Sequence, residues 1–208
     1  MYIQRSIDQQ LLEWKQSSVH KPLLLRGARQ VGKSSAIRHL GETFKHYIEV
    51  NFEKRPELKG LFEKTSDVHQ LAARLGMLYN VPIEAGKTLV FLDEIQACPE
   101  AIKSLWFFKE DFPELHVVAA GSLLEFALKE LTSYGVGRIR SLFMYPLSFD
   151  EFLQAQGKAS WIEEKRKADH NHPLFEALHQ ELVQQYRTFL MVGGMPASVV
   201  AWLETQDY

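Results

Sequence analysis

The stretch Pro22-Leu-Leu-Leu-Arg-Gly-Ala-Arg-Gln-Val-Gly-Lys-Ser34 joins a short apolar run to the pattern G-x-x-x-x-G-K-[ST]. Glycines in such a loop let the backbone turn so that successive N–H groups point inward and surround the phosphates of a nucleotide. A helix is expected directly after the loop, and the positive end of its dipole favours the same phosphates. The stretch therefore predicts a strand, a phosphate-binding loop and a helix.

The loop and the first turn of the following helix contain the expected nucleotide ligands. Lys33 would reach the β- and γ-phosphates, and the hydroxyl of Ser34 would bind Mg²⁺. The full set predicted to contact the nucleotide is Gly27, Ala28, Arg29, Gln30, Val31, Gly32, Lys33, Ser34 and Ser35.

A second run, Thr88-Leu-Val-Phe-Leu-Asp-Glu-Ile-Gln96, is apolar until it ends in two acids. Such a run predicts a strand buried on both faces, as in the middle of a parallel sheet. Because side chains alternate across a strand, Asp93 and Glu94 are expected to differ in role. Asp93 suits the Mg²⁺ sphere, directly or through water, and Glu94 would orient and deprotonate the water that attacks the γ-phosphate. The pair predicts hydrolysis rather than nucleotide binding alone.

The rest of the chain predicts alternating strands and helices. Strands are expected over 22–26, 46–52, 88–93, 115–120 and 141–145, with helices between them, including 56–79 and 123–131. This order implies an α/β fold with a doubly wound, five-stranded parallel sheet and a ligand at the carboxyl ends of the strands. Gly27, Asp93 and Ser122 all follow such ends.

The predicted domain organisation is a nucleotide-binding core over 1–150 and a small all-helical lid over 151–208. Ser148-Phe-Asp-Glu151 has the form of a capping box and is expected to begin a helix. Residues 158–172 are polar and are expected to form a surface loop. Further helices are predicted over 173–192 and from Pro196 to about residue 204.

Composition constrains partners and location. The chain of 208 residues has 24 Lys and Arg against 26 Asp and Glu, a formal net charge of −2 that provides no global basic surface for nucleic acid. Cys98 is the only cysteine, so no internal disulfide can form. With no signal peptide and no membrane-length apolar run, we expect a cytoplasmic protein without membrane contact.

Several motifs together resemble the AAA-type P-loop ATPase domain of a large prokaryotic family. They are Gly27–Ser34, Phe91–Gln96, Ala120-Gly-Ser122, Gly137-Arg138 and Tyr145–Phe152. The domain is similar to archaeal ATPases and, more distantly, to the signalling ATPases with numerous domains. The resemblance implies a P-loop NTPase fold with a helical lid. Family members usually continue into a C-terminal domain, so we expect this chain to be truncated, with that effector domain absent.

The resemblance gives three further residues candidate roles. Ser122 is placed like the polar sensor that reports on the γ-phosphate or the water, although it could equally cap a helix beginning at residue 123. Arg138 is placed like an arginine finger, acting within its subunit or across an interface; Arg140 competes for that role, and both could simply be solvated. Pro196 resembles the proline that packs on adenine, or it is an ordinary helix breaker.

The predicted function is therefore Mg²⁺-dependent ATP binding and hydrolysis, with Glu94, Lys33, Ser122 and Arg138 as catalytic residues and Ser34 and Asp93 as metal ligands. Two uses of that cycle remain open. One is a nucleotide-controlled molecular switch for a C-terminal effector domain. The other is a motor or loader linked to DNA, with DNA bound through the missing domain. A homo-oligomer is a possible assembly for either use.

Overall fold

The computed structural model describes residues 2–18, 20–122 and 137–207. The chain divides into two compact units, one of Asp8–Met144 and one of Met1–Ile7 with Tyr145–Tyr208. The first is called the sheet unit and the second the helical unit, and each is described by itself. The helix predicted over 123–131 lies outside the described residues.

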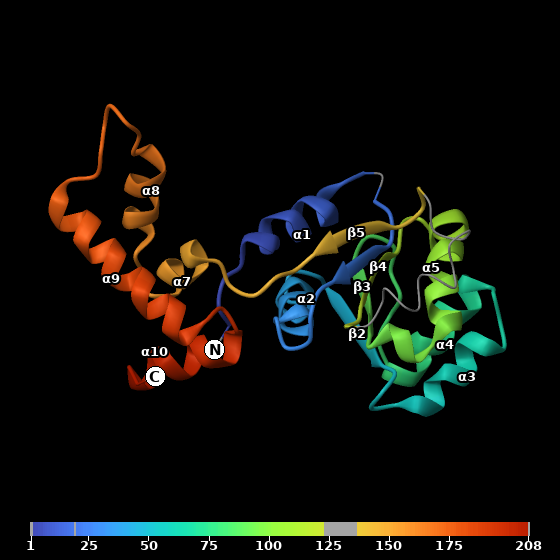
Figure 1. Cartoon of the computed structure of the whole chain (residues 1–208). Coiled ribbons are helices and arrows are strands. Elements are labelled where there is room, and N and C mark those ends of the chain that lie inside the picture. Colours follow the sequence, from blue (N-terminus) through green and yellow to red (C-terminus); the bar gives the residue numbers. More distant parts are fainter. Residues whose placement is uncertain (1, 19, 123–136, 208) are drawn as a thin grey trace. The chain divides into compact units, whose positions relative to one another are not determined.

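The sheet unit contains five parallel strands in the order β2-β3-β4-β1-β5 (Figure 1). Their bounds are β1 Leu23–Arg26, β2 His46–Asn51, β3 Thr88–Asp93, β4 His116–Ala120 and β5 Arg140–Phe143. This confirms the predicted α/β class and the five-stranded parallel sheet. The order places β4 between the strand that enters the phosphate loop and the strand that ends in the two acids.

One helix precedes the first strand, and further helices connect the strands. Their bounds are α1 Ser6–Gln16, α2 Lys33–Gly41, η1 Pro56–Leu58, α3 Lys59–Glu63, α4 Val68–Tyr79, η2 Ile95–Ala97 and α5 Pro99–Asp111. The continuous helix predicted over 56–79 is wrong, because the chain leaves the helix after Glu63 and restarts at α4. Asp67 caps that restart, its Oδ1 accepting hydrogen bonds from the backbone N–H groups of His69 at 2.9 Å and Gln70 at 3.1 Å.

Both faces of the central strands are buried, and alternation decides which residues face which layer. Ile48 and Val50 of β2, with Val90 and Leu92 of β3, belong to the core that also contains residues of α4 and α5. The alternate residues of β2 and β3 therefore point to the opposite face. There Arg38 of α2 contacts β2, so α2 covers that face. In β3 this alternate set is Leu89, Phe91 and Asp93. Asp93 therefore lies on the α2 face, as its contact with Ser34 shows.

The helical unit consists of four described helices, α7 Phe149–Ala155, α8 Ala159–Lys167, α9 Glu176–Val192 and α10 Pro196–Thr205. Its core contains Phe152, Val199 and Trp202. The predicted capping box at Ser148 and Glu151 is confirmed. The surface loop predicted over 158–172 is wrong, because α8 lies within it and buries Ile162 against other helices of the unit.

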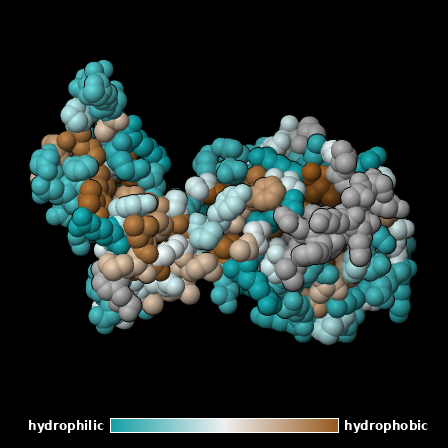
Figure 2. Space-filling view, viewed as in Figure 1, coloured by the Kyte–Doolittle hydropathy of each residue, from teal (hydrophilic) through white to brown (hydrophobic). Residues whose placement is uncertain are grey.

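The first residues of the chain belong to the helical unit. The carboxylate of Glu151 accepts hydrogen bonds from the backbone and hydroxyl of Ser6 at 2.7 and 2.8 Å, and Arg5 lies 3.2 Å from it. The chain thus passes from one unit to the other between residues 7 and 8 and between residues 144 and 145. Figure 2 shows apolar surface on the helical unit, where exposed apolar residues include Phe175, Leu190 and Met191. Among the described helices, none has the length and apolar character needed to cross a bilayer.

Candidate functional site

The phosphate loop follows β1 and passes close to the end of β5. Gly27 has φ 148°, and a Cβ at this position would collide with the backbone oxygen of Met144. The close approach is held by the N–H of Met144, which donates to the carbonyl of Arg26 at 2.8 Å. At the other end of the loop, Gly32 caps α2 with φ 99°. Both glycine positions of the motif therefore have backbone angles that side chains rarely adopt.

Lys33, the first residue of α2, directs its ammonium into the loop. Its Nζ donates to the carbonyl oxygens of Gly27 at 2.9 Å and Ala28 at 2.7 Å. Burial lowers the pKa of Lys33, while the negative charges of Glu94 and Asp93 oppose that shift. A buried cation inside a loop of this shape suits a polyanion such as a nucleoside triphosphate.

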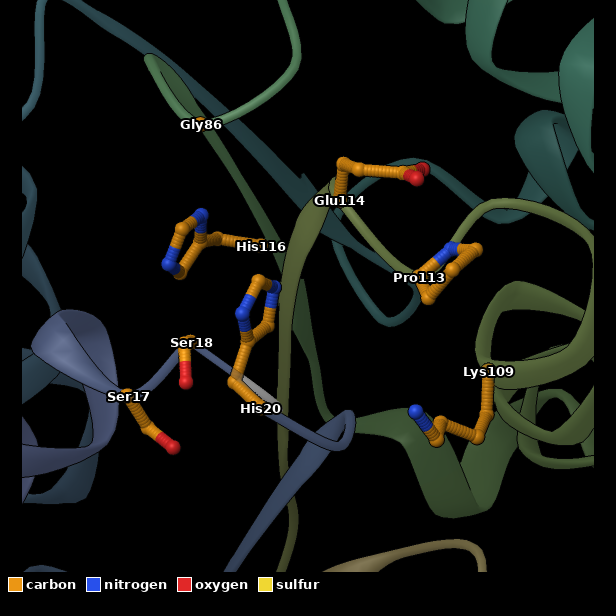
Figure 3. A pocket seen from close by; sticks show the side chains of 8 residues that line it. All are labelled: Ser17, Ser18, His20, Gly86, Lys109, Pro113, Glu114 and His116. Carbon is orange, nitrogen blue, oxygen red and sulfur yellow. The ribbon is translucent and has the colours of Figure 1, made fainter.

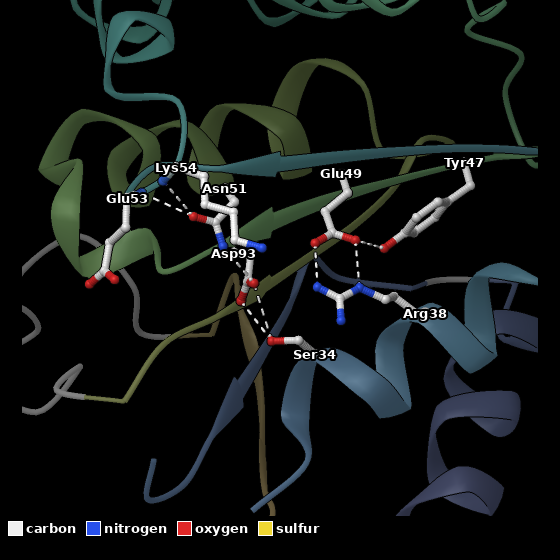
Figure 4. A network of polar contacts seen from close by, with 8 residues as sticks. All are labelled: Ser34, Arg38, Tyr47, Glu49, Asn51, Glu53, Lys54 and Asp93. Atoms are coloured by element: carbon white, nitrogen blue, oxygen red, sulfur yellow. Dashed lines mark hydrogen bonds and ion pairs between the residues drawn. The ribbon is translucent and has the colours of Figure 1, made fainter. Parts of the chain in front are cut away.

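Ser34 and Asp93 meet on the α2 face of the sheet (Figure 4). The hydroxyl of Ser34 lies 3.1 and 3.2 Å from the two carboxylate oxygens of Asp93. Burial raises the pKa of Asp93, and its hydrogen bonds with Ser34 and Asn51 oppose that rise. A hydroxyl beside a buried carboxylate is the oxygen-donor chemistry that Mg²⁺ prefers.

Asn51 is a site residue that the sequence analysis missed. It is the register partner of Asp93, and its Nδ2 donates to Asp93 Oδ2 at 2.9 Å. Its Oδ1 accepts from the backbone N–H groups of Glu53 and Lys54 at 3.1 and 2.9 Å, so the side chain is held at both ends (Figure 4). Adjacent strands end at the same edge of a parallel sheet, but spacing in the sequence does not show that β2 and β3 are adjacent, so it could not identify Asn51.

The same face carries a second polar cluster that fastens α2 to β2. Arg38 makes two hydrogen bonds with Glu49, at 2.9 and 2.7 Å, and the hydroxyl of Tyr47 donates to Glu49 at 2.8 Å (Figure 4). Hydrogen bonding to Arg38 lowers the pKa of Glu49, and burial raises the pKa of Tyr47. A two-point contact of this kind fixes the helix that carries Lys33 and Ser34.

Glu94 follows Asp93 in an unusual backbone conformation. It has φ 50° and ψ 45°, the left-handed region, and precedes η2. Its Oε2 accepts a hydrogen bond from Nε2 of Gln96 at 2.7 Å, a contact that the sequence analysis did not foresee although Gln96 lies in the quoted motif.

The remaining loop residues differ in their surroundings. Arg29 is 72% exposed and lies 4.0 Å from Glu53, and Gln30 has φ 63°. Ala28 and Ser35 are exposed, whereas Val31 is buried. Ser122 follows β4 at the carboxyl edge of the sheet, between the strands that carry Gly27 and Asp93. The strand order thus brings Ser122 to the same edge as the loop, and its sensor role stays a prediction.

The structure does not bring Arg138 to this group within the subunit. Arg138 precedes β5 and so lies at the amino edge of the parallel sheet, opposite the phosphate loop. Its Nε donates to Glu110 at 2.6 Å, and its guanidinium lies 4.3 Å from the ring centre of Trp106. Arg140, the other candidate, is the first residue of β5 at the same edge. Pro196 is the first residue of α10 in the helical unit.

A separate cavity of about 400 Å³ lies at the amino edge of the sheet, away from Lys33 (Figure 3). His20 and His116 stack beside it with ring centres 3.9 Å apart, and Trp14 packs edge-on against both. His116 Nε2 lies 3.0 Å from the carbonyl oxygen of Lys15. This cavity has none of the nucleotide ligands.

The fold and the site together define a P-loop α/β domain: a phosphate loop on β1, a buried carboxylate at the end of β3, and β4 between them. A family of AAA domains matches residues 19–153, and the chain belongs to that family. The resemblance inferred from the sequence motifs is thereby confirmed.

Among solved structures, the chain is similar to the Walker-type ATPase PABY2304 of Pyrococcus abyssi, with a TM-score of 0.59 and 20% sequence identity. The match covers 99% of this chain and 69% of that one, and at this identity it supports the fold alone. No curated protein matches the chain.

Proposed function

We propose that the sheet unit binds ATP with Mg²⁺ and hydrolyses its terminal phosphoanhydride. The observation that carries this proposal is the contact between Ser34 and Asp93 at 3.1 Å, one residue from Lys33 on one side and one residue from Glu94 on the other. A phosphate ligand, two metal ligands and a candidate base are thus gathered at one edge of the sheet.

The residues present fit a magnesium ion. Ser34 and Asp93 would hold it, and Asn51 would keep the carboxylate of Asp93 in place through its 2.9 Å hydrogen bond. When bound, Mg²⁺ neutralises charge on the β- and γ-phosphate oxygens. Oxygen-only ligands with room for water are typical of protein magnesium sites.

In this mechanism each side chain has a separate task. Lys33 binds the β- and γ-phosphates, and the loop N–H groups orient them. Glu94 orients the water and accepts one of its protons as the water oxygen bonds to the γ-phosphorus and the bond to the bridging oxygen breaks. ADP, phosphate and a protonated Glu94 result.

The direct test is substitution of the lysine. We expect Lys33→Ala to abolish measurable ATP binding in equilibrium titration, because the loop loses the buried ammonium that lies within it. The fold should persist, since the ammonium packs against loop carbonyls and not in the apolar core. Circular dichroism checks that point. Unchanged ATP affinity in Lys33→Ala would rule out the phosphate-loop assignment.

We further propose that the ATP cycle serves as a switch for the helical unit and for an effector domain that follows it in family members. Pro196, at the start of α10, would contact the adenine. The alternative is a motor or loader that acts on DNA. Measuring ATP turnover with and without double-stranded DNA separates them, because a DNA-linked motor should accelerate severalfold and a switch should not.

We propose a catalytic role for Arg138 only in a homo-oligomer, where it would act across an interface between subunits. Its position at the amino edge of the sheet supports no contact with the nucleotide of its own subunit. In a homo-oligomer it would act as an arginine finger on the nucleotide of a neighbour.

A further inference from the structure

The side-chain amide of Gln96 can contact the carboxylate of Glu94 in only one orientation. Nε2 of Gln96 lies 2.7 Å from Oε2 of Glu94. Because an ionised carboxylate only accepts hydrogen bonds, the amide nitrogen must face it and the amide oxygen must point elsewhere. The contact therefore leaves Oε1 as the Glu94 oxygen that is free of Gln96.

The backbone between the two residues is shaped to make this contact. Glu94 is in the left-handed region, which is uncommon and strained for a residue with a side chain. The following turn is closed by the N–H of Ala97, which donates to the carbonyl of Glu94 at 3.0 Å. Ile95 is fully buried in the core and anchors the turn. Residue 96 is thereby brought back beside residue 94.

The amide oxygen of Gln96 makes no described hydrogen bond that would favour the opposite orientation of the amide. Oε1 of Gln96 is buried, and no described residue donates a hydrogen bond to it. A buried acceptor without a donor is unfavourable, so such an arrangement persists where another requirement holds it. The hydrogen bond between Nε2 of Gln96 and Glu94 is the contact that favours this orientation of the amide.

We propose that Gln96 is a positioning residue for the base: it holds Oε2 of Glu94 so that Oε1 takes the proton of the attacking water. The inference rests on the proposed ATP hydrolysis. In that step the water oxygen bonds to the γ-phosphorus, the bond to the bridging oxygen breaks, and one water proton moves to Oε1 of Glu94. Gln96 exchanges no proton and is not consumed.

The experiment compares Gln96→Leu, which keeps the bulk but loses the donor, with wild type under saturating ATP and Mg²⁺. We expect kcat to fall roughly 10-fold to 100-fold, as for loss of a hydrogen bond to a charged group. The KM for ATP should not change, because the hydrogen bond that is lost goes to Glu94 and not to a nucleotide ligand. The melting temperature should not fall, because leucine removes a buried acceptor that lacks a donor. In a Glu94→Gln background the same substitution should not lower kcat further, since the base is already absent.

A matched control is Gln70→Leu. Gln70 donates its Nε2 to a carboxylate, Oδ2 of Asp67, at 3.0 Å, but on α4, and this variant should keep wild-type kcat. Wild-type kcat in Gln96→Leu, or an equal loss in both backgrounds, overturns the positioning role while hydrolysis by Glu94 stands. A wild-type protein without ATPase activity, or full turnover in Glu94→Gln, overturns the proposed function instead, and the role of Gln96 with it.

Discussion

Glu94 is the residue on which turnover is expected to depend most. Glu94→Gln keeps the size of the side chain but cannot accept a proton from water. We expect ATP affinity to be retained and kcat to fall by about 10²–10⁴-fold, the usual contribution of a general base. Single-turnover measurements with labelled ATP give the rate, and nucleotide titration gives the affinity. Turnover close to wild type would mean that the base lies elsewhere.

For single residues, the sequence predicted the site members that lie within motifs and missed those whose position depends on strand order or on an unusual backbone angle. Lys33, Ser34, Asp93 and Glu94 follow from spacing alone. Asn51 joins them only because β2 and β3 are neighbours in register, and strand order is a long-range property that spacing does not contain. Gln96 contacts Glu94 because of a left-handed backbone angle at a residue that is not glycine, which local propensity argues against.

The junction of α1 and β4 carries a prediction about pH. His116 is buried beside His20, and burial, with the nearby His20 charge, lowers the pKa of His116 from 6.5 to about 4. Between pH 4 and pH 6.5, the unfolded chain therefore carries a proton on His116 that the folded chain does not. The resulting stability is complete above about pH 6.5 and is lost as pH falls toward 4. By pH 4.5 we expect roughly 2–3 kcal/mol less free energy of unfolding from this group.

Urea unfolding at pH 7 and pH 4.5 measures that loss, and His116→Gln isolates it because an amide does not titrate. The difference between the two pH values should shrink in His116→Gln and stay at the wild-type value in His170→Gln, which changes an exposed loop histidine. An equal pH dependence in wild type and His116→Gln would contradict the prediction. The ring protons of His116 should also titrate near pH 4 by NMR.

Elements with a strong apolar pattern could be predicted, and those held by polar contacts could not. Strands β1, β3 and β4 are mostly apolar, and β2 alternates between apolar and polar residues. All five strands were predicted to within a few residues. Helix α8 is mostly polar. It buries Ile162, and its Lys165 and Arg166 pair with Asp150 of α7 at 2.8 and 3.1 Å. The acidic partner of those ion pairs lies on another helix, α7, so the polar residues 158–172 taken by themselves predicted a loop.

At the scale of the whole molecule, substitution of Arg138 tests whether the protein hydrolyses ATP as a homo-oligomer. If this arginine acts on the nucleotide of a neighbour, ATP turnover per subunit should rise with protein concentration and Arg138→Ala should be slow. Mixing Arg138→Ala with Glu94→Gln should then restore part of the activity, because some interfaces pair an intact base with an intact arginine. Steady-state assays over a range of concentrations and mixing ratios measure both effects.

The control for this experiment is Glu110→Gln, which breaks the 2.6 Å ion pair of Arg138 and leaves the arginine in place. It should retain most of the turnover. Equal losses in Arg138→Ala and Glu110→Gln would assign the arginine to its contacts on α5, and full activity in Arg138→Ala would leave it no catalytic part. Arg140→Ala tests the competing residue two positions on.

Because both ends of the chain belong to the helical unit, the sheet unit is tied to it by two covalent connections, at residues 7–8 and 144–145. The second connection follows directly after Met144, whose N–H donates to the carbonyl of Arg26, the residue before Gly27. The backbone that enters the phosphate loop and the backbone that leaves the sheet unit therefore share a hydrogen bond, so a nucleotide that shifts the start of the loop also acts on the residue where the sheet unit ends.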